Sequence, residues 1–220
     1  MKKIFFVFFL SISITVVAQK KSRHTPIIQK GWYLTFNPHS LLEVDQGAVG
    51  LGIGYRLSNR IELWTEMSYL YKSFFQNSGN FDNLKGFRSI TSFKYYYYNK
   101  HGMFVGAEFR IKNYSFDDKN TFINSQTNDT IKNFQYTPSH TLIGGGVFWG
   151  KRFKLSANGK FELEGNIGIG VKQRIINRKN VPSGYSKIKY DNRGFSPIPH
   201  TDAEGAYPYF PAIVRFIYHL

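Results

Sequence analysis

Apolar and polar side chains alternate residue by residue through several stretches of this chain, and that alternation limits the possible folds more than any other feature. Between 47 and 57, for example, Val49, Leu51 and Ile53 share one face, while glycines and Arg56 occupy the other. Neighbouring residues of a β-strand point to opposite faces of the sheet. The pattern therefore predicts an all-β fold whose strands each have one apolar and one polar face.

The spacing of these stretches predicts how the strands are connected. Short turns follow the second, fourth and sixth stretch, and longer segments follow the others. Bacterial membrane barrels have an even number of strands, with short periplasmic turns and long outer loops. We therefore predict an eight-stranded antiparallel up-and-down transmembrane β-barrel with both termini in the periplasm. The expected strands cover residues 31–37, 47–57, 61–72, 87–98, 103–114, 140–155, 160–175 and about 207–220.

The N-terminus has the features of an export signal. Lys2 and Lys3 precede an apolar run from 4 to 17, and Val16-Val17-Ala18 supplies small or aliphatic residues before a cleavage site. A run this short does not span a bilayer as a helix, so an uncleaved anchor is the weaker alternative. We expect a signal peptide over 1–18, a polar lead-in over 19–30 and the barrel over 31–220. Without cysteine, the chain has no disulfide and no lipoprotein anchor.

The alternation alone does not say which face points outward. In a soluble β-sandwich or a lipocalin-like periplasmic carrier, the apolar face would point inward. Two observations favour a barrel in the outer membrane, among lipids and lipopolysaccharide. Glycines and charges of both signs share one face, and aromatic residues, 18% of the chain, gather near the strand ends of the other face. The final strand, ending in Tyr218 and Leu220, is similar to the signal read by barrel-insertion machinery.

The charged residues of the polar face are expected to meet inside the barrel. Buried charges must be paired, and both signs occur on facing strands. Trp64, Phe104 and Phe148 would fill the remaining space, so we predict a barrel without an open pore. The predicted structural ion-pair network consists of Glu62, Glu66, Arg88, Glu108, Arg110, Glu164, Lys172 and Arg215, and Arg56, Lys94 and Glu162 are assigned to the same face.

No motif in the chain predicts a cofactor or a metal site. Gly145–Arg152 matches GxxxxGK, but no Ser or Thr follows the lysine, and neither this run nor Gly50–Gly54 leads into a helix. His200, Asp202 and Glu204 could together bind a divalent cation. A solvated polar loop is the preferred interpretation, because no second cluster of ligands accompanies them.

The formal net charge of +15 raises the question of a nucleic-acid partner. The basic residues are spread along the strands rather than gathered on one face, and a basic balance alone indicates only that anions are attracted. We therefore expect no nucleic-acid partner. The sequence identifies no protein partner.

His140 is the candidate for catalysis. Some eight-stranded outer-membrane barrels modify lipid A with a histidine and a nearby Ser or acid on the lipid-facing side, and Ser139-His140-Thr141 could resemble that arrangement. Leu142 occupies the place of the serine in the deacylase pattern. A catalytic triad is defined by its geometry. We therefore predict no catalytic residue, with a lipid A-modifying enzyme as the alternative.

Three segments are similar to a known family. They are Asn37-Pro38 with Ser40-Leu41-Leu42, leading into Gly52-Ile53-Gly54-Tyr55-Arg56-Leu57-Ser58-Asn59-Arg60; Gly86-Phe87-Arg88, leading to Lys94-Tyr95-Tyr96-Tyr97; and Lys160-Phe161, leading to Gly170-Val171-Lys172. Together they resemble small outer-membrane barrels of Bacteroidetes that have no assigned activity, the DUF3575-like group. The likeness covers about residues 31–175. It implies an outer-membrane barrel and brings no catalytic residue, so we expect a structural or surface-interaction protein.

Overall fold

The computed structural model describes residues 30–38, 40, 47–72, 82–98, 102–187 and 204–220. The secondary-structure elements of these residues are all β-strands, so the all-β prediction is confirmed. Within the same residues, no helix is long and apolar enough to cross a membrane. The expected signal peptide over 1–18 and all of the lead-in except Lys30 lie outside the described residues.

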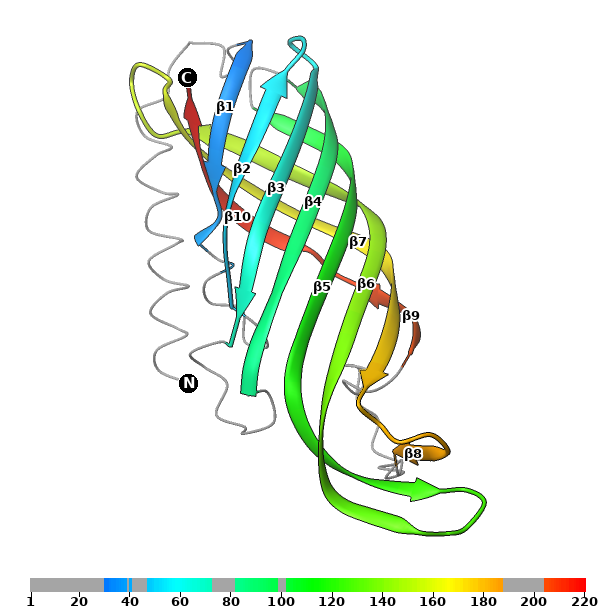
Figure 1. Ribbon diagram of the computed structural model, residues 1–220. Coiled ribbons are helices and arrows are strands. Elements are labelled where there is room, and N and C mark those ends of the chain that lie inside the picture. Colours follow the sequence, from blue (N-terminus) through cyan, green and yellow to red (C-terminus); the bar gives the residue numbers. More distant parts are fainter. Residues whose placement is uncertain (1–29, 39, 41–46, 73–81, 99–101, 188–203) are drawn as a thin grey trace, which may run out of the picture.

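The strands follow one another along the chain and pair antiparallel in one sheet (Figure 1). Their lengths differ widely, from 3 residues in β8 to 25 in β6. They are β1 (Gly31–Phe36), β2 (Gly47–Arg56), β3 (Ile61–Tyr71), β4 (Asp82–Tyr98), β5 (Met103–Asn124), β6 (Thr130–Lys154), β7 (Phe161–Lys179), β8 (Tyr185–Lys187), β9 (Gly205–Tyr209) and β10 (Ala212–His219).

Eight of these strands close into a ring. Each strand from β1 to β6 pairs with the next one, and β10 pairs with both β7 and β1. The last predicted strand is split into β9 and β10, which pair with successive parts of β7. The split falls at Phe210 and Pro211, where proline offers no N–H to the ladder. All eight predicted strands are therefore present, and they close in the predicted order.

The connections divide the ring into two ends. The ends of β2, β4 and β6 and the starts of β3, β5 and β7 lie at one end, called here the short-turn end. The chain also finishes there, because the backbone N–H of Leu220 donates to the carbonyl of Trp32 at 3.2 Å. The end of β1, the start of β2, the end of β3, the start of β4 and the end of β7 lie at the opposite end, called here the long-connection end (Figure 1).

Part of the predicted loop structure is wrong. Instead of an unpatterned loop over 115–137, β5 and β6 continue as a hairpin that bends away from the ring, with β8 paired to its end (Figure 1). We call residues 116–137 the projecting hairpin. The second predicted loop, 176–207, contains the end of β7, β8 and the start of β9, and its residues 188–203 are not described.

The two faces of the strands differ sharply in polarity. Apolar side chains point out of the ring, with Leu51 70% exposed and Ile167 58% exposed, whereas the inward face buries charged groups such as Arg152 and Glu164. On the outer wall, the side-chain hydroxyls of Thr65 and Thr91 share a hydrogen bond of 3.1 Å. Six residues predicted to face outward are exposed, and Ile111 is half-buried: Val49, Leu51, Ile53, Phe109, Ile111, Ile167 and Ile169.

Large side chains fit into the interior because glycines are their direct partners on the neighbouring strand. A methyl group at Gly54 would overlap the ring of Tyr33, and one at Gly150 would overlap the ring of Phe104. Both aromatic residues are completely buried. The inward glycines therefore make room for interior rings, in a space where eight strands leave only enough width for side chains.

Candidate functional site in the interior of the ring

The sheet register brings opposite charges together inside the ring near its short-turn end. Glu62 on β3 is the direct partner of Lys94 on β4. Glu164 on β7 lies between two partners, Arg152 on β6 and Arg215 on β10. Directly opposite residues on one face of a sheet have neighbouring side chains. These residues all point into the ring. The pairing of neighbouring strands therefore suffices to place each carboxylate beside a cation.

Further bonds cross the interior and join these pairs. The ammonium of Lys94 donates to Glu62 at 2.9 Å and to Glu164 at 2.8 Å. The Nη2 atom of Arg152 donates to Glu62 at 2.8 Å and to Glu164 at 2.7 Å. Because β3 and β4 lie across the ring from β7, these bonds tie opposite walls together.

The network extends toward the chain terminus. Arg152 Nη1 lies 3.5 Å from Glu162, whose carboxylate lies 2.9 Å from the Nε2 atom of His219. Arg215 Nε lies 3.4 Å from Glu164, with its guanidinium 3.8 Å from the centre of the Trp64 ring. We define the ring-core network as these linked groups: Glu62, Lys94, Arg152, Glu162, Glu164, Arg215 and His219.

Aromatic hydroxyls complete the coordination of Glu62. Tyr33 donates to one carboxylate oxygen, and Tyr96 donates to the other at 3.0 Å. The guanidinium of Arg56 lies over the Tyr96 ring, 4.0 Å from its centre. Cations beside aromatic faces gain further stabilisation when water is excluded. The network is thus enclosed by rings as well as by opposite charges.

The ring-core network is balanced in charge and closed to solvent. Its three carboxylates face the cations Lys94, Arg152 and Arg215, and no member is more than 4% exposed. Buried pairs of this kind are costly to break, because removing one partner leaves an uncompensated charge. None of these groups is open to a substrate. The network therefore fills the interior and links its walls.

Two smaller clusters lie farther toward the long-connection end. In one, Arg88 contacts Glu66 at 3.3 Å and donates to the Ser40 hydroxyl at 2.7 Å. In the other, Glu108 accepts from Arg110 at 2.7 Å and from the Tyr209 hydroxyl at 2.9 Å. The side chain of Arg110 is 19% exposed, so this second cluster is less enclosed than the ring-core network.

The structure places the sequence-assigned residues in three separate groups. Glu62, Glu164 and Arg215 lie in the ring-core network, and the other two clusters hold Glu66 with Arg88 and Glu108 with Arg110. Lys172 is half-buried on β7. Arg152 is not among the residues predicted for the network, although its side chain contacts all three carboxylates of the ring-core network. Its importance follows from its position directly opposite Glu164 on the neighbouring strand. The sequence of a single strand does not show this register.

His140 does not lie on the outer wall. Its side chain is fully buried inside the ring, stacked on Tyr114 with ring centres 4.9 Å apart and 5.3 Å from the Phe116 ring centre. Its Nδ1 atom is 3.4 Å from the Tyr114 hydroxyl. In this position the imidazole is part of an aromatic stack and does not meet a substrate approaching from outside the ring.

The candidate cation ligands of the last long connection are only partly described. His200 and Asp202 lie outside the described residues, and Glu204 lies 3.6 Å from Arg178. In the part of the chain that the structure covers, no group of three or more His, Cys, Asp or Glu side chains is arranged to hold a metal ion.

Comparison with known proteins identifies no relative: no protein-family model, curated protein or solved structure matches this chain.

Proposed function

We propose that this protein is an outer-membrane β-barrel that spans the bilayer, has no open pore and serves a structural or surface-interaction role. The observation that carries the proposal is the polarity of its wall, which is reversed from that of a soluble protein. The outside is apolar, and the inside buries charged groups together with aromatic and other apolar side chains. Lipid-facing apolar residues alternating with polar interior residues are the signature of a membrane barrel. In water, the same outer face would be an unusually large exposed apolar surface.

The outer wall also has the aromatic residues expected at a membrane interface. Trp32 and Tyr55 pair near the short-turn end with ring centres 4.7 Å apart, and Phe161 pairs with Tyr218 at 4.9 Å. The indole N–H of Trp149 donates to the Tyr97 hydroxyl at 2.7 Å. Amphipathic rings favour the boundary between hydrocarbon and water. We define the aromatic belt as Trp32, Tyr55, Tyr95, Tyr97, Trp149, Phe161 and Tyr218, all exposed.

The reversed polarity weighs against a periplasmic carrier, which would hold its ligand in an apolar interior. The enclosed ring-core network supports a closed rather than a conducting barrel, because its bonds cross the interior. The position of His140 gives no support to the alternative of a lipid A-modifying enzyme. Membership of the DUF3575-like group and cleavage after Ala18 remain part of the proposal.

The surface role rests on the projecting hairpin. Phe122 and Tyr136 pack edge to face with ring centres 5.0 Å apart, and Lys187 of β8 lies 3.8 Å from Asp118. This small core gives the hairpin internal contacts of its own beyond the ring. Structured projections on a fixed scaffold are suitable positions for binding.

The test is to reconstitute the purified full-length protein in lipid vesicles and in a planar bilayer. We expect a folded, heat-modifiable species that inserts into the vesicles, and bilayer recordings without stepwise conductance. A folded protein that stays soluble without detergent would contradict the membrane assignment. Stable conductance steps of porin size would contradict the closed interior.

A further inference from the structure

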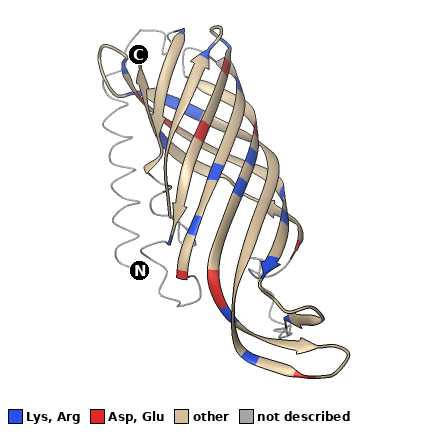
Figure 2. Cartoon of the chain, in the orientation of Figure 1, with Lys and Arg blue, Asp and Glu red and all other residues tan. Residues whose placement is uncertain are grey.

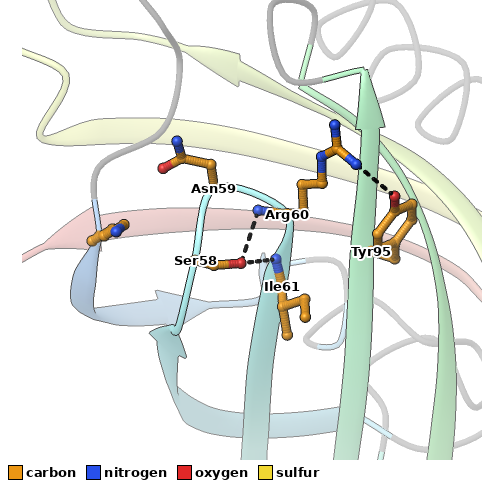
Figure 3. A pocket seen from close by; sticks show the side chains of 6 residues that line it. Ser58, Asn59, Arg60, Ile61 and Tyr95 are labelled. Carbon is orange, nitrogen blue, oxygen red and sulfur yellow. Dashed lines mark hydrogen bonds between the residues drawn. The ribbon is translucent and has the colours of Figure 1, made fainter.

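A pocket at the short-turn end has the chemistry of an anion site. It has a volume of about 400 Å³ and is lined by Lys30, Ser58–Ile61 and Tyr95 (Figure 3). Two of the lining side chains, Lys30 and Arg60, are cationic and exposed, and none is acidic. A pocket with charges of one sign raises the local concentration of the opposite ion.

The turn that forms the pocket is held from inside the ring. Buried Arg56 donates to the carbonyl of Ser58 at 3.0 Å and to that of Asn59 at 2.6 Å. These two carbonyl oxygens are therefore occupied by a cation and do not repel an anion in the pocket. The Ser58 hydroxyl oxygen accepts from the backbone N–H groups of Arg60 and Ile61, at 3.2 and 3.1 Å.

Arg60 is oriented toward the outer wall. Its Nη1 atom donates to the hydroxyl of Tyr95 on β4 at 3.3 Å, as Figure 3 shows. A guanidinium has five N–H donors in a planar fork. One bond to Tyr95 therefore fixes the side chain and leaves other donors for phosphate oxygens.

The distribution of exposed charge singles out this end of the molecule. Among the described residues, the acidic side chains that are not buried inside the ring all lie toward the long-connection end: Asp82, Asp117, Asp118, Asp129 and Glu204 (Figure 2). The short-turn end has the basic side chains Lys30, Arg60, Lys151, Lys154 and Lys160, and the terminal carboxylate of Leu220. The pocket also borders the aromatic belt, through Tyr95. A basic pocket beside interfacial aromatic rings is placed where lipid headgroups lie.

We propose that the pocket of Lys30, Arg60 and Tyr95 binds the phosphate headgroup of an anionic phospholipid in the periplasmic leaflet. This inference rests on the proposed membrane-spanning barrel. The lipid chains would lie along the apolar outer wall below Tyr95, while the two cations and the Ser58–Asn59 turn contact the phosphate. The site would fix the depth of the short-turn end in the leaflet.

The test uses the full-length protein in vesicles of phosphatidylcholine and phosphatidylglycerol, with bromine on the chains of one lipid or the other. Exposed Trp32 reports on lipid next to this end through quenching of its fluorescence, in a Trp149→Phe background. We expect the wild-type pocket to prefer phosphatidylglycerol over phosphatidylcholine by about fivefold or more. Replacing both Lys30 and Arg60 by Gln should remove the preference.

A matched control removes two exposed lysines from the projecting hairpin, Lys119→Gln with Lys132→Gln, and should keep the preference. An unchanged preference in the Lys30 and Arg60 variant would overturn the inference, and so would an equal loss in the control. Abolition of the preference by millimolar inorganic phosphate would assign the site to free phosphate instead of lipid. Failure of the wild-type protein to insert into either lipid would contradict the proposed barrel itself and is recognised separately by its lack of heat-modifiable folding.

Discussion

The interior of the ring and the projecting hairpin are built from the same kinds of residue but in different surroundings. Each has a fully buried phenylalanine, Phe104 in the ring and Phe122 in the hairpin, packed against tyrosine. Each also has ion pairs. In the ring these side chains are sealed by eight strands, whereas the Lys187–Asp118 pair of the hairpin is 15% and 13% exposed.

This difference shows that the contribution of a contact to stability depends more on its enclosure than on the types of residue that form it. A charge inside the ring has no access to water once its partner is removed. Loss of the partner therefore lowers the free energy of unfolding of the whole protein. A charge in the hairpin is solvated when its partner is lost, and the hairpin can open while the ring stays closed. Local and global stability therefore separate between the two regions.

The largest effect is expected from Arg152→Met. The substitution leaves the buried carboxylates of Glu62 and Glu164 short of one shared cation, and removal of one partner from such a site costs roughly 3 to 5 kcal/mol. The measurement is the free energy of unfolding in guanidinium, for protein folded into vesicles. The matched variant Lys187→Met, at the contact of β8 with the hairpin, should lose no more than about 1 kcal/mol, because Asp118 keeps access to water when its partner is removed.

A second variant separates charge imbalance from loss of packing. Adding Glu164→Gln to Arg152→Met leaves two carboxylates, Glu62 and Glu162, against two cations, Lys94 and Arg215. The double variant should recover part of the lost stability. Equal losses in Arg152→Met and Lys187→Met would show that enclosure does not distinguish the two regions.

The outer wall gives a second test of the ring. Ile53 is exposed on β2, and its replacement by Lys would place a charge in the proposed hydrocarbon region. The expected loss is roughly 2 to 4 kcal/mol near the membrane midplane. Ile53→Leu is the control and should be nearly neutral. If Ile53→Lys folds into vesicles as stably as Ile53→Leu, this wall does not face lipid.

Alanine substitution of the two buried phenylalanines, Phe104 in the ring and Phe122 in the hairpin, compares the two regions most directly. Phe104→Ala should cost about 3 to 5 kcal/mol of global stability, the usual range for a buried ring. Phe122→Ala should instead increase cutting by protease at 125–129, with less than about 1 kcal/mol change in global unfolding, because the hairpin opens alone. Urea or guanidinium titration together with limited proteolysis measures both quantities. A global loss in Phe122→Ala equal to that in Phe104→Ala would make the hairpin part of the same cooperative unit.

The sequence predicts the ring better than the hairpin for a physical reason. Where one face is buried, as in β2, a strand must alternate strictly, and its strand pattern is visible in Val49, Leu51 and Ile53. In the hairpin the register shifts between Asn120 and Phe122, and Asn133 has a positive φ of 55°. Each irregularity breaks the alternation, so a run of polar residues gave no strand signal.

Within the ring, the sequence indicates which residues face inward but not which of them meet. Glu62 and Arg152 are far apart in the chain and come together because β3 and β6 lie on different sides of a closed ring. That contact depends on ring closure and on the register of every intervening strand. The alternation within a single strand gives no information about ring closure or about register.

The smallest expected effect is a pH dependence at the base of the projecting hairpin. The carboxylate of Asp117 accepts hydrogen bonds from the Asn83 amide at 2.8 Å and the Thr137 hydroxyl at 3.0 Å, and these bonds lower the pKa of Asp117 from its ordinary value. A lowered folded-state pKa means that the stabilisation is present above the unfolded-state pKa and is lost as the pH falls through the folded-state pKa. Asp117 joins the start of β4 to the hairpin, so acidification should loosen the hairpin base while the ring keeps its fold. Carboxyl NMR titration in micelles gives the pKa, and protection of hairpin amides, corrected for the intrinsic exchange rate, gives the opening. Asp117→Asn keeps one acceptor and should remove this pH dependence; a wild-type hairpin whose protection stays constant through the titration of Asp117 would show that these two hydrogen bonds do not hold its base.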